Sequence, residues 1–183
     1  MAFVRQLRTP TIFNALEHAK LQGEVVRFGF PESVYRHYER LAAFPRGLLT
    51  VGDAICRFNP VYGQGMSVAA QEAVVLRQLL STRSDEADAL DGLASPFFAE
   101  AAALIDNPWF GAVIPDFAHP KTRGTRPENL EAMLKLGTAL LRLAARDPSV
   151  HKLAAEVQNL LKPRSAYLDP ELVQKVQALT ASG

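Results

Sequence analysis

Two short features of this sequence could bind a ligand, and both lie between residues 47 and 80. Gly63 and Gly65 flank Gln64 just before a helical pattern, and glycines in this place let another group approach the backbone closely. The first turn of such a helix offers unpaired N–H groups and the positive end of the helix dipole, which attract electron-rich oxygens. Asp53 follows a short apolar run, where its carboxylate can accept hydrogen bonds from a sugar or polyol hydroxyl. Asp53 is therefore the first candidate ligand.

A strand, a loop and a helix are the elements that would position these residues. The apolar run at 48–51 predicts a buried parallel strand that ends at Gly52, and a loop with Asn59 and Pro60 follows it. Either feature alone, the Gly-Asp pair or the glycine pair, is as compatible with an ordinary turn as with a binding site. The helix is predicted over 65–80 from residues spaced three and four apart, namely Met66, Ala69, Ala70, Ala73, Val74 and Leu80.

The combination of the two features is more specific than either one. The segment VGDAICRFNPVYGQGMSVAAQEA resembles the C-terminal flavin-contacting segment of FAD-dependent monooxygenases of the aromatic hydroxylase type. It is most similar to bacterial FAD-dependent oxidoreductases in which Phe-Asn-Pro precedes Tyr-Gly-Gln-Gly-Met, as in residues 58–66 here. The resemblance extends over most of the chain.

This resemblance implies a cofactor site for FAD. It implies that Asp53 contacts the ribityl chain and that Pro60 borders the flavin. It also implies that the backbone from 63 to 66 faces the pyrimidine end of the isoalloxazine ring. The implied cofactor-binding residues are Gly52, Asp53, Pro60, Gly63, Gln64, Gly65 and Met66.

The reaction implied by the resemblance is a monooxygenation. NAD(P)H would reduce the flavin, and the reduced flavin would activate oxygen toward a small organic substrate. A reductase or a halogenase would use the same segment, so the reaction type stays open. No residue in the sequence stands out as a general acid or base.

One half of the expected cofactor site is missing from the sequence. Rossmann-type FAD domains hold the pyrophosphate with a GxGxxG loop, and none of the eleven glycines forms that spacing. We therefore expect the C-terminal fragment of a Rossmann-type flavoprotein, α+β but mainly α, with few strands and about six helices. Residues 1–46 would be a remnant of the substrate domain with its connection, 47–80 the FAD-contacting unit and 81–183 a helical region.

Composition narrows the remaining functions. The chain has 183 residues, 48% hydrophobic content and a net charge of +1, which predicts a globular protein without a basic patch for nucleic acid. No apolar run is long enough to span a membrane, so we expect a cytoplasmic protein. The four histidines are far apart and predict no metal site. Cys56, the single cysteine, is expected to be a packing residue.

The rest of the chain predicts further elements. Residues 1–8 read as extended, a helix should run from Thr9-Pro10 to about Lys20, and 24–30 should form a strand. In the polar stretch 31–46, Arg36 or His37 either contacts the cofactor or substrate, or belongs to a solvated connection. Residues 81–91 should be a polar linker. Four helices should begin at capping residues followed by proline: Ser95-Pro96, Thr125-Arg126-Pro127, Asp147-Pro148 and Asp169-Pro170.

Two alternatives remain for the whole chain and one for a loop. In residues 107–126, Trp109, Phe110 and Phe117 either wall an apolar substrate pocket or anchor the loop to the core. The chain itself could be a non-enzymatic helical interaction protein. It could also be a split subunit that binds FAD only with a partner supplying the GxGxxG half. Because its strands would lack neighbours, we expect the isolated chain to be marginally stable or a homo-oligomer.

Overall fold

The protein is mainly helical, as expected. The computed structural model describes residues 2–83 and 87–181. Its helices are α1 (Ala2–Arg5), α2 (Thr11–Glu17), α3 (Gly65–Ser81), α4 (Ala94–Asp116), α5 (Leu130–Ala144), α6 (Pro148–Gln158) and α7 (Pro170–Ala181). Two short strands, β1 (Val34–Tyr35) and β2 (Cys56–Arg57), pair antiparallel, with Val34 opposite Arg57. The described residues form no parallel sheet, so the predicted Rossmann-type sheet is not seen in them.

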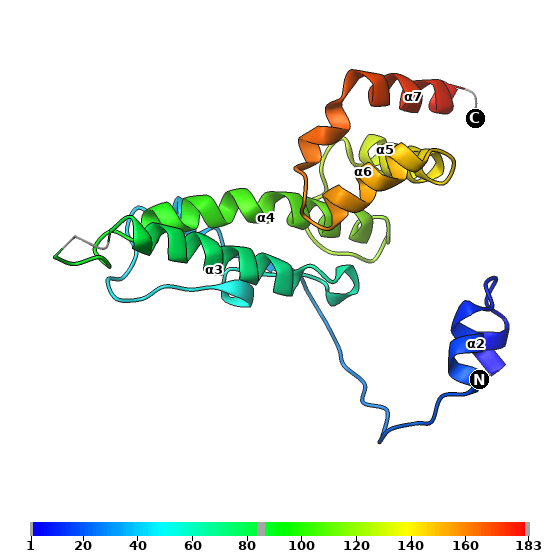
Figure 1. The fold of residues 1–183 in the computed structure, drawn as a ribbon, viewed down its shortest axis with the longest axis horizontal. Coiled ribbons are helices and arrows are strands. Elements are labelled where there is room, and N and C mark those ends of the chain that lie inside the picture. The colour runs from blue at the N-terminus through cyan, green and yellow to red at the C-terminus, as the bar shows by residue number, and fades with distance from the viewer. Residues whose placement is uncertain (1, 84–86, 182–183) are drawn as a thin grey trace.

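Helices α3 and α4 lie side by side and form the main body of the molecule (Figure 1). Their core is apolar, because α4 is apolar almost all round and buries Phe97, Phe98, Ala101 and Ile105. Val68 of α3 and the β2 region complete the cluster through Ile55, Cys56 and Phe58. Burying one such aromatic side chain contributes about 2–3 kcal/mol to folding. This core holds the two segments on either side of β2 against α3 and α4.

A second core joins α5, α6 and α7 near the C-terminal end of α4 (Figure 1). The buried members are Ala139, Val150, Leu172 and Val176. The predicted caps at the starts of α6 and α7 are confirmed. Asp147 Oδ1 accepts from the backbone N–H groups of Ser149 and Val150, and Asp169 Oδ1 accepts from those of Glu171 and Leu172.

The predictions for the starts of α4 and α5 were wrong. Helix α4 begins at Ala94 after Leu93, and α5 begins at Leu130 after Asn129, with no side-chain cap at either position. The expected loop at 107–126 was also too long, because α4 continues through Pro108 and Pro115 to Asp116. Pro108 is fully buried. The apolar face of α4 therefore outweighs the lost backbone hydrogen bonds of its prolines.

The predicted strands at 24–30 and 48–51 were wrong as well. Both stretches belong to no strand or helix in the described structure, and Val25, Val26 and Phe28 are more than three-quarters exposed. A strand needs a neighbour for its backbone groups, and these stretches have none here. Residues 1–8, expected to be extended, include α1, and α2 ends at Glu17 rather than near Lys20. Figure 1 shows α1 and α2 on an extended arm away from the helical body.

Candidate functional site

Asp53 lies in a tight 3₁₀ turn, η2 (Gly52–Ala54), instead of at the end of a strand. Gly52 has φ +58°, a left-handed conformation that favours glycine, and a Cβ there would lie 3.5 Å from Ala69 Cβ. Asp53 is exposed. Its Oδ1 lies 3.8 Å from where a Cβ at Gly65 would be, so the carboxylate stands beside the first turn of α3. The fold thus brings Asp53 close to Gly65, the second glycine of the pair.

Pro60 begins a second 3₁₀ turn, η3 (Pro60–Tyr62). The Asn59 side chain caps this turn by accepting a hydrogen bond from Val61 N–H at 3.2 Å. Gly63 ends the turn in the left-handed region with φ 68°, which any side chain would strain. No atom lies within 4 Å of a Cβ built at Gly63, so the backbone there is open to an approaching group.

Helix α3 starts at Gly65 with free amide groups. Val68 N–H bonds back to Gln64 O at 3.0 Å, and the amides before it have no acceptor inside the helix. Gln64 makes no capping bond and instead donates from Nε2 to Gln158 O at 2.9 Å. The Met66 side chain is 87% exposed. This helix start can donate to oxygen atoms of a bound group.

Glu72 is a buried acid that the sequence analysis missed. Its side chain is fully buried, Oε2 accepts from Gly52 N–H at 2.6 Å, and Oε1 has no hydrogen-bond partner among the described residues. Burial raises the pKa of this carboxyl, the negative charge of Asp53 raises it further, and the Gly52 N–H bond acts in the opposite direction. Glu72 therefore fixes the backbone of the turn that presents Asp53. The sequence signal that could have revealed Glu72 is its position one helical turn after Val68, on the apolar face of α3.

Cys56 behaves as the packing residue that was expected. Its side chain is 2% exposed, and burial together with the charges of Glu72 and Asp53 raises the pKa of the thiol to about 12. The group therefore stays a neutral thiol near neutral pH and is a poor nucleophile.

Arg36 and His37 differ in their relation to the site. Arg36 is exposed, and its Nη1 donates to the backbone carbonyl of Asp53 at 3.5 Å, so the guanidinium stands beside the turn. His37 Nδ1 lies 2.7 Å from Glu39 Oε1, and its ring packs on Tyr35 with centroids 3.9 Å apart. His37 is thus engaged within its own segment, and only Arg36 reaches the candidate site.

The three aromatic residues of the predicted loop are anchors. Trp109 packs between Tyr35 and Phe58, at centroid distances of 5.5 and 6.3 Å. The Arg164 guanidinium lies over the Phe110 ring, and Phe117 is buried beneath the Arg126 guanidinium. None of these rings lines either of the two cavities described next. The contacts favour anchoring to the core over a substrate wall.

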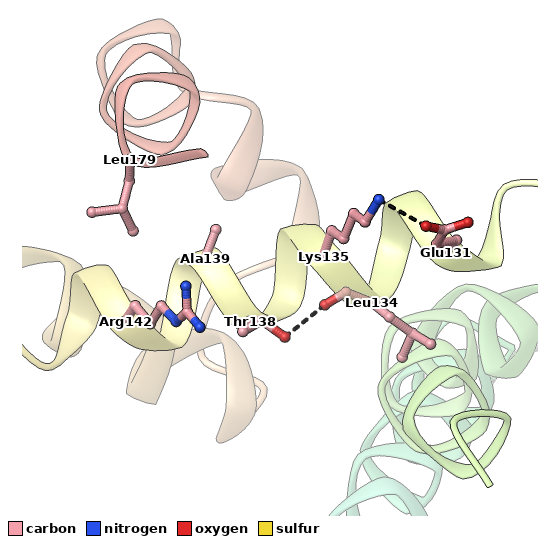
Figure 2. Close-up of a pocket in the computed structure, with 7 residues that line it drawn as sticks. All are labelled: Glu131, Leu134, Lys135, Thr138, Ala139, Arg142 and Leu179. Atoms are coloured by element: carbon pink, nitrogen blue, oxygen red, sulfur yellow. Dashed lines mark hydrogen bonds and ion pairs between the residues drawn. The ribbon is translucent and has the colours of Figure 1, made fainter. Parts of the chain in front are cut away.

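Two cavities lie outside the predicted site. One, of about 520 Å³, is bordered by α5 and Leu179 of α7 (Figure 2). Three of its polar side chains are already engaged within α5, because Lys135 pairs with Glu131 at 2.7 Å and Thr138 Oγ1 donates to Leu134 O at 2.9 Å. The other, of about 440 Å³, lies between residues 43–49, the C-terminal half of α3 and residues 90–94. Neither is lined by any of the seven predicted cofactor-binding residues.

The described residues contain neither a cluster of metal ligands nor a helix suited to span a membrane. They gather no group of three or more His, Cys, Asp or Glu that could hold a metal ion. None of the helices they form is both long enough and apolar enough to cross a membrane.

Comparison with known proteins points to the same part of the chain. The family model for squalene epoxidase matches residues 29–102, which include η2, η3 and all of α3. That family is related to the flavin monooxygenases and is flavin-dependent. The match supports a flavoprotein-type segment here.

A curated protein gives a second, local similarity. Protein Rv3254 of Mycobacterium tuberculosis (strain H37Rv) is 41% identical over 70 residues, which are 38% of this chain. The chain spans about 15% of the length of that relative. The similarity is therefore that of a segment.

Proposed function

We propose that residues 47–80 are the flavin-contacting unit of an FAD-dependent oxidoreductase of the monooxygenase type. The observation that carries the proposal is the placement of Asp53 beside the free amides at the start of α3, inside the region that matches a flavin-dependent family. An acceptor carboxylate and a row of N–H donors suit a ribityl chain and a polar ring edge respectively.

Each predicted residue has a place in this proposal. Asp53 accepts hydrogen bonds from ribityl hydroxyls, and Gly52 gives its turn the left-handed backbone. Pro60 borders the ring, and the backbone at Gly63, Gln64, Gly65 and Met66 donates to the pyrimidine end. The open space at Gly63 and the exposure of Met66 fit an approaching planar group. When bound, the flavin would take electrons from NAD(P)H and deliver them to oxygen or substrate.

In this proposal, the chain supplies one half of an FAD-binding site. These 183 residues contain no GxGxxG loop, so we propose that a GxGxxG-bearing half outside them binds the pyrophosphate and adenosine. The chain alone would then recognise the isoalloxazine ring and the ribityl group. It follows that riboflavin and FAD bind this chain with similar affinity. The pyrophosphate and adenosine, which FAD has and riboflavin lacks, make no contact with it in this proposal.

The test is a titration of the full chain with FAD, riboflavin and lumichrome, followed by flavin absorbance and fluorescence. Asp53→Ala should weaken FAD and riboflavin about 10- to 100-fold, because a hydrogen bond to a charged group is worth about 1.5–3 kcal/mol. Lumichrome, which lacks the ribityl chain, should be unaffected by this change. Asp106→Ala, an exposed aspartate of α4, is the matched control.

One outcome of this titration would contradict the proposed function. If neither the chain alone nor the chain mixed with a GxGxxG-bearing partner retains flavin after gel filtration, the proposal is wrong. The resemblance would then describe ancestry only.

A further inference from the structure

The last residue of α4, Asp116, binds the loop that would face the flavin. Its half-buried carboxylate accepts a hydrogen bond from Tyr62 Oη at 2.8 Å. Asn59 Nδ2 donates to the same carboxylate, at 3.3 Å from Oδ1 and 3.4 Å from Oδ2. The backbone carbonyl of Asp116 accepts from Thr122 Oγ1 at 2.7 Å, which anchors the end of the helix. Asp116 thus joins both ends of the η3 turn to α4.

The two donors define the loop conformation. Asn59 uses both ends of its amide: Oδ1 caps the turn at Val61 N–H, and Nδ2 is held by Asp116. Tyr62 is the last residue of the turn and directly precedes Gly63, whose left-handed backbone sends the chain into α3. With both ends held, Pro60 and Gly63 have a fixed relation to Asp53 and to the helix start.

The charge on Asp116 strengthens these bonds. In the part of the chain that the structure describes, no lysine or arginine forms an ion pair with Asp116, so neutral donors alone satisfy the carboxylate. Hydrogen bonds to an ionised acceptor are roughly twice as strong as those between neutral groups. Burial and the bond to Asp116 both raise the pKa of Tyr62, which keeps its hydroxyl protonated and available as a donor.

We infer that Asp116 is a positioning residue that holds the Asn59–Gly63 loop in the conformation competent for flavin. This inference rests on the proposed function for its ligand, and on the three hydrogen bonds for its geometry. Asp116 lies outside the region that matches the squalene epoxidase family, as does Gln158, whose carbonyl holds Gln64. The helical region after residue 102 would therefore shape the cofactor site without touching the cofactor.

The first measurement needs no flavin. Hydrogen exchange of the Val61, Tyr62 and Gly63 amides in the full chain reports on the loop, because their N–H groups are bonded inside it. Asp116→Ala should accelerate this exchange at least tenfold. Asp116→Asn, which keeps an acceptor for the tyrosine hydroxyl, should recover most of the protection. Asp106→Ala, on the same helix, should change nothing.

The second measurement is FAD affinity of the same variants, with the shape of the visible flavin band as a spectroscopic signature. Asp116→Ala should weaken binding about tenfold and broaden the band, and Asp116→Asn should restore both. If Asp116→Ala does not fold, Tyr62→Phe removes one of the bonds without truncating the core and should give a smaller change in the same direction.

The outcomes separate the two proposals. Unchanged loop exchange in Asp116→Ala and Tyr62→Phe would overturn the inference. Faster exchange with unchanged FAD affinity would overturn the positioning role and leave the proposed function intact. Faster exchange in a chain that binds no flavin, with or without a GxGxxG-bearing partner, would support the hold of Asp116 on the loop and overturn the proposed function.

Discussion

The buried carboxyl group of Glu72 destabilises the core of this protein. A buried carboxylate that keeps one oxygen unbonded loses hydration without full compensation. It is tolerated because the other oxygen holds Gly52 N–H, and that bond sets the turn carrying Asp53. The stability lost at this position serves the geometry of the candidate site.

The raised pKa of Glu72 gives a pH dependence with a definite sign. A group whose pKa is higher in the folded protein stabilises it below its unfolded pKa of about 4.5, and that contribution is lost as the pH rises through the folded pKa. Glu72→Gln stays neutral and keeps an acceptor for Gly52 N–H. Relative to the wild type, this variant should therefore gain Tm as the pH rises above about 4.5.

Thermal melts followed by circular dichroism would check this. Glu72→Leu, which leaves Gly52 N–H without its acceptor, should lose about 1–3 kcal/mol. Glu100→Gln, an exposed glutamate of α4, is the control and should follow the wild-type pH profile. A Glu72→Gln profile parallel to the wild type would show that the carboxyl does not titrate as argued.

Sequence reasoning found the residues of the site that lie within one continuous motif. Asp53, Gly63 and Gly65 could be grouped because their spacing resembles that of a known family. Asp116 and Gln158 could not, because they reach the site from 57 residues beyond Asn59 and 94 residues beyond Gln64. No local pattern encodes which distant side chain will meet a loop.

Among the elements, helix starts were predictable where a residue pair supplies both the capping side chain and a proline in the first turn. Asp147-Pro148 and Asp169-Pro170 do so, and both aspartates cap as expected. At Ser95-Pro96 the helix instead begins at Ala94, and its capping position is Leu93, two residues before Ser95. Leu93 is buried, so tertiary packing decided that boundary against the local signal.

Asp147 couples the start of α6 to pH. Hydrogen bonds from Ser149 and Lys175 lower the pKa of its carboxyl to about 2. A lowered pKa gives stability that is present above the unfolded value of about 4 and is lost as the pH falls through the folded value. Asp147→Asn should therefore lower Tm near pH 6 and differ little from the wild type near pH 2.

This prediction is checked by melts across that pH range, with Asp106→Asn as the control for an exposed aspartate. A constant difference in Tm between the Asp147 variant and the wild type at all pH values would contradict it. Lys175→Met should reproduce part of the effect, since Lys175 Nζ lies 3.2 Å from Asp147 Oδ2.

The strand predictions fail because a strand, unlike a helix, needs a neighbouring strand for its backbone hydrogen bonds. A helix satisfies its own backbone, so α3 could be predicted from residues within it. A strand depends on a neighbour, and the apolar patterns at 24–30 and 48–51 carry no information on whether one is present. The two-residue strands β1 and β2 have too little sequence between them to form a recognisable pattern.

At the scale of the whole molecule, the exposed arm before β1 is the main liability. Leu21, Val25, Val26 and Phe28 are each at least 78% exposed on a segment without a helix or strand. An extended apolar segment with unpaired backbone groups is a template for pairing with another chain. We therefore predict that the isolated chain self-associates through residues 21–30.

The double substitution Val26→Ser and Phe28→Ser should raise the monomer fraction in sedimentation velocity. It should leave Tm unchanged, because these side chains are exposed in the folded chain. Arg27→Ser, between them, should leave association unaltered. A wild-type chain that melts cooperatively as a monomer, independently of concentration, would contradict this prediction.

The hydrogen bonds from Asn59 and Tyr62 to Asp116 also set an order of events during synthesis. Asn59 leaves the ribosome 57 residues before Asp116, which at about 5–20 residues per second is about 3–11 s. Until α4 has emerged and docked, the η3 turn lacks its long-range anchor and keeps the conformational entropy of an open loop. The loop within the segment of clearest sequence signature therefore becomes rigid only after α4 has docked. A flavin present during translation would meet a finished surface only after the helical region has folded behind it.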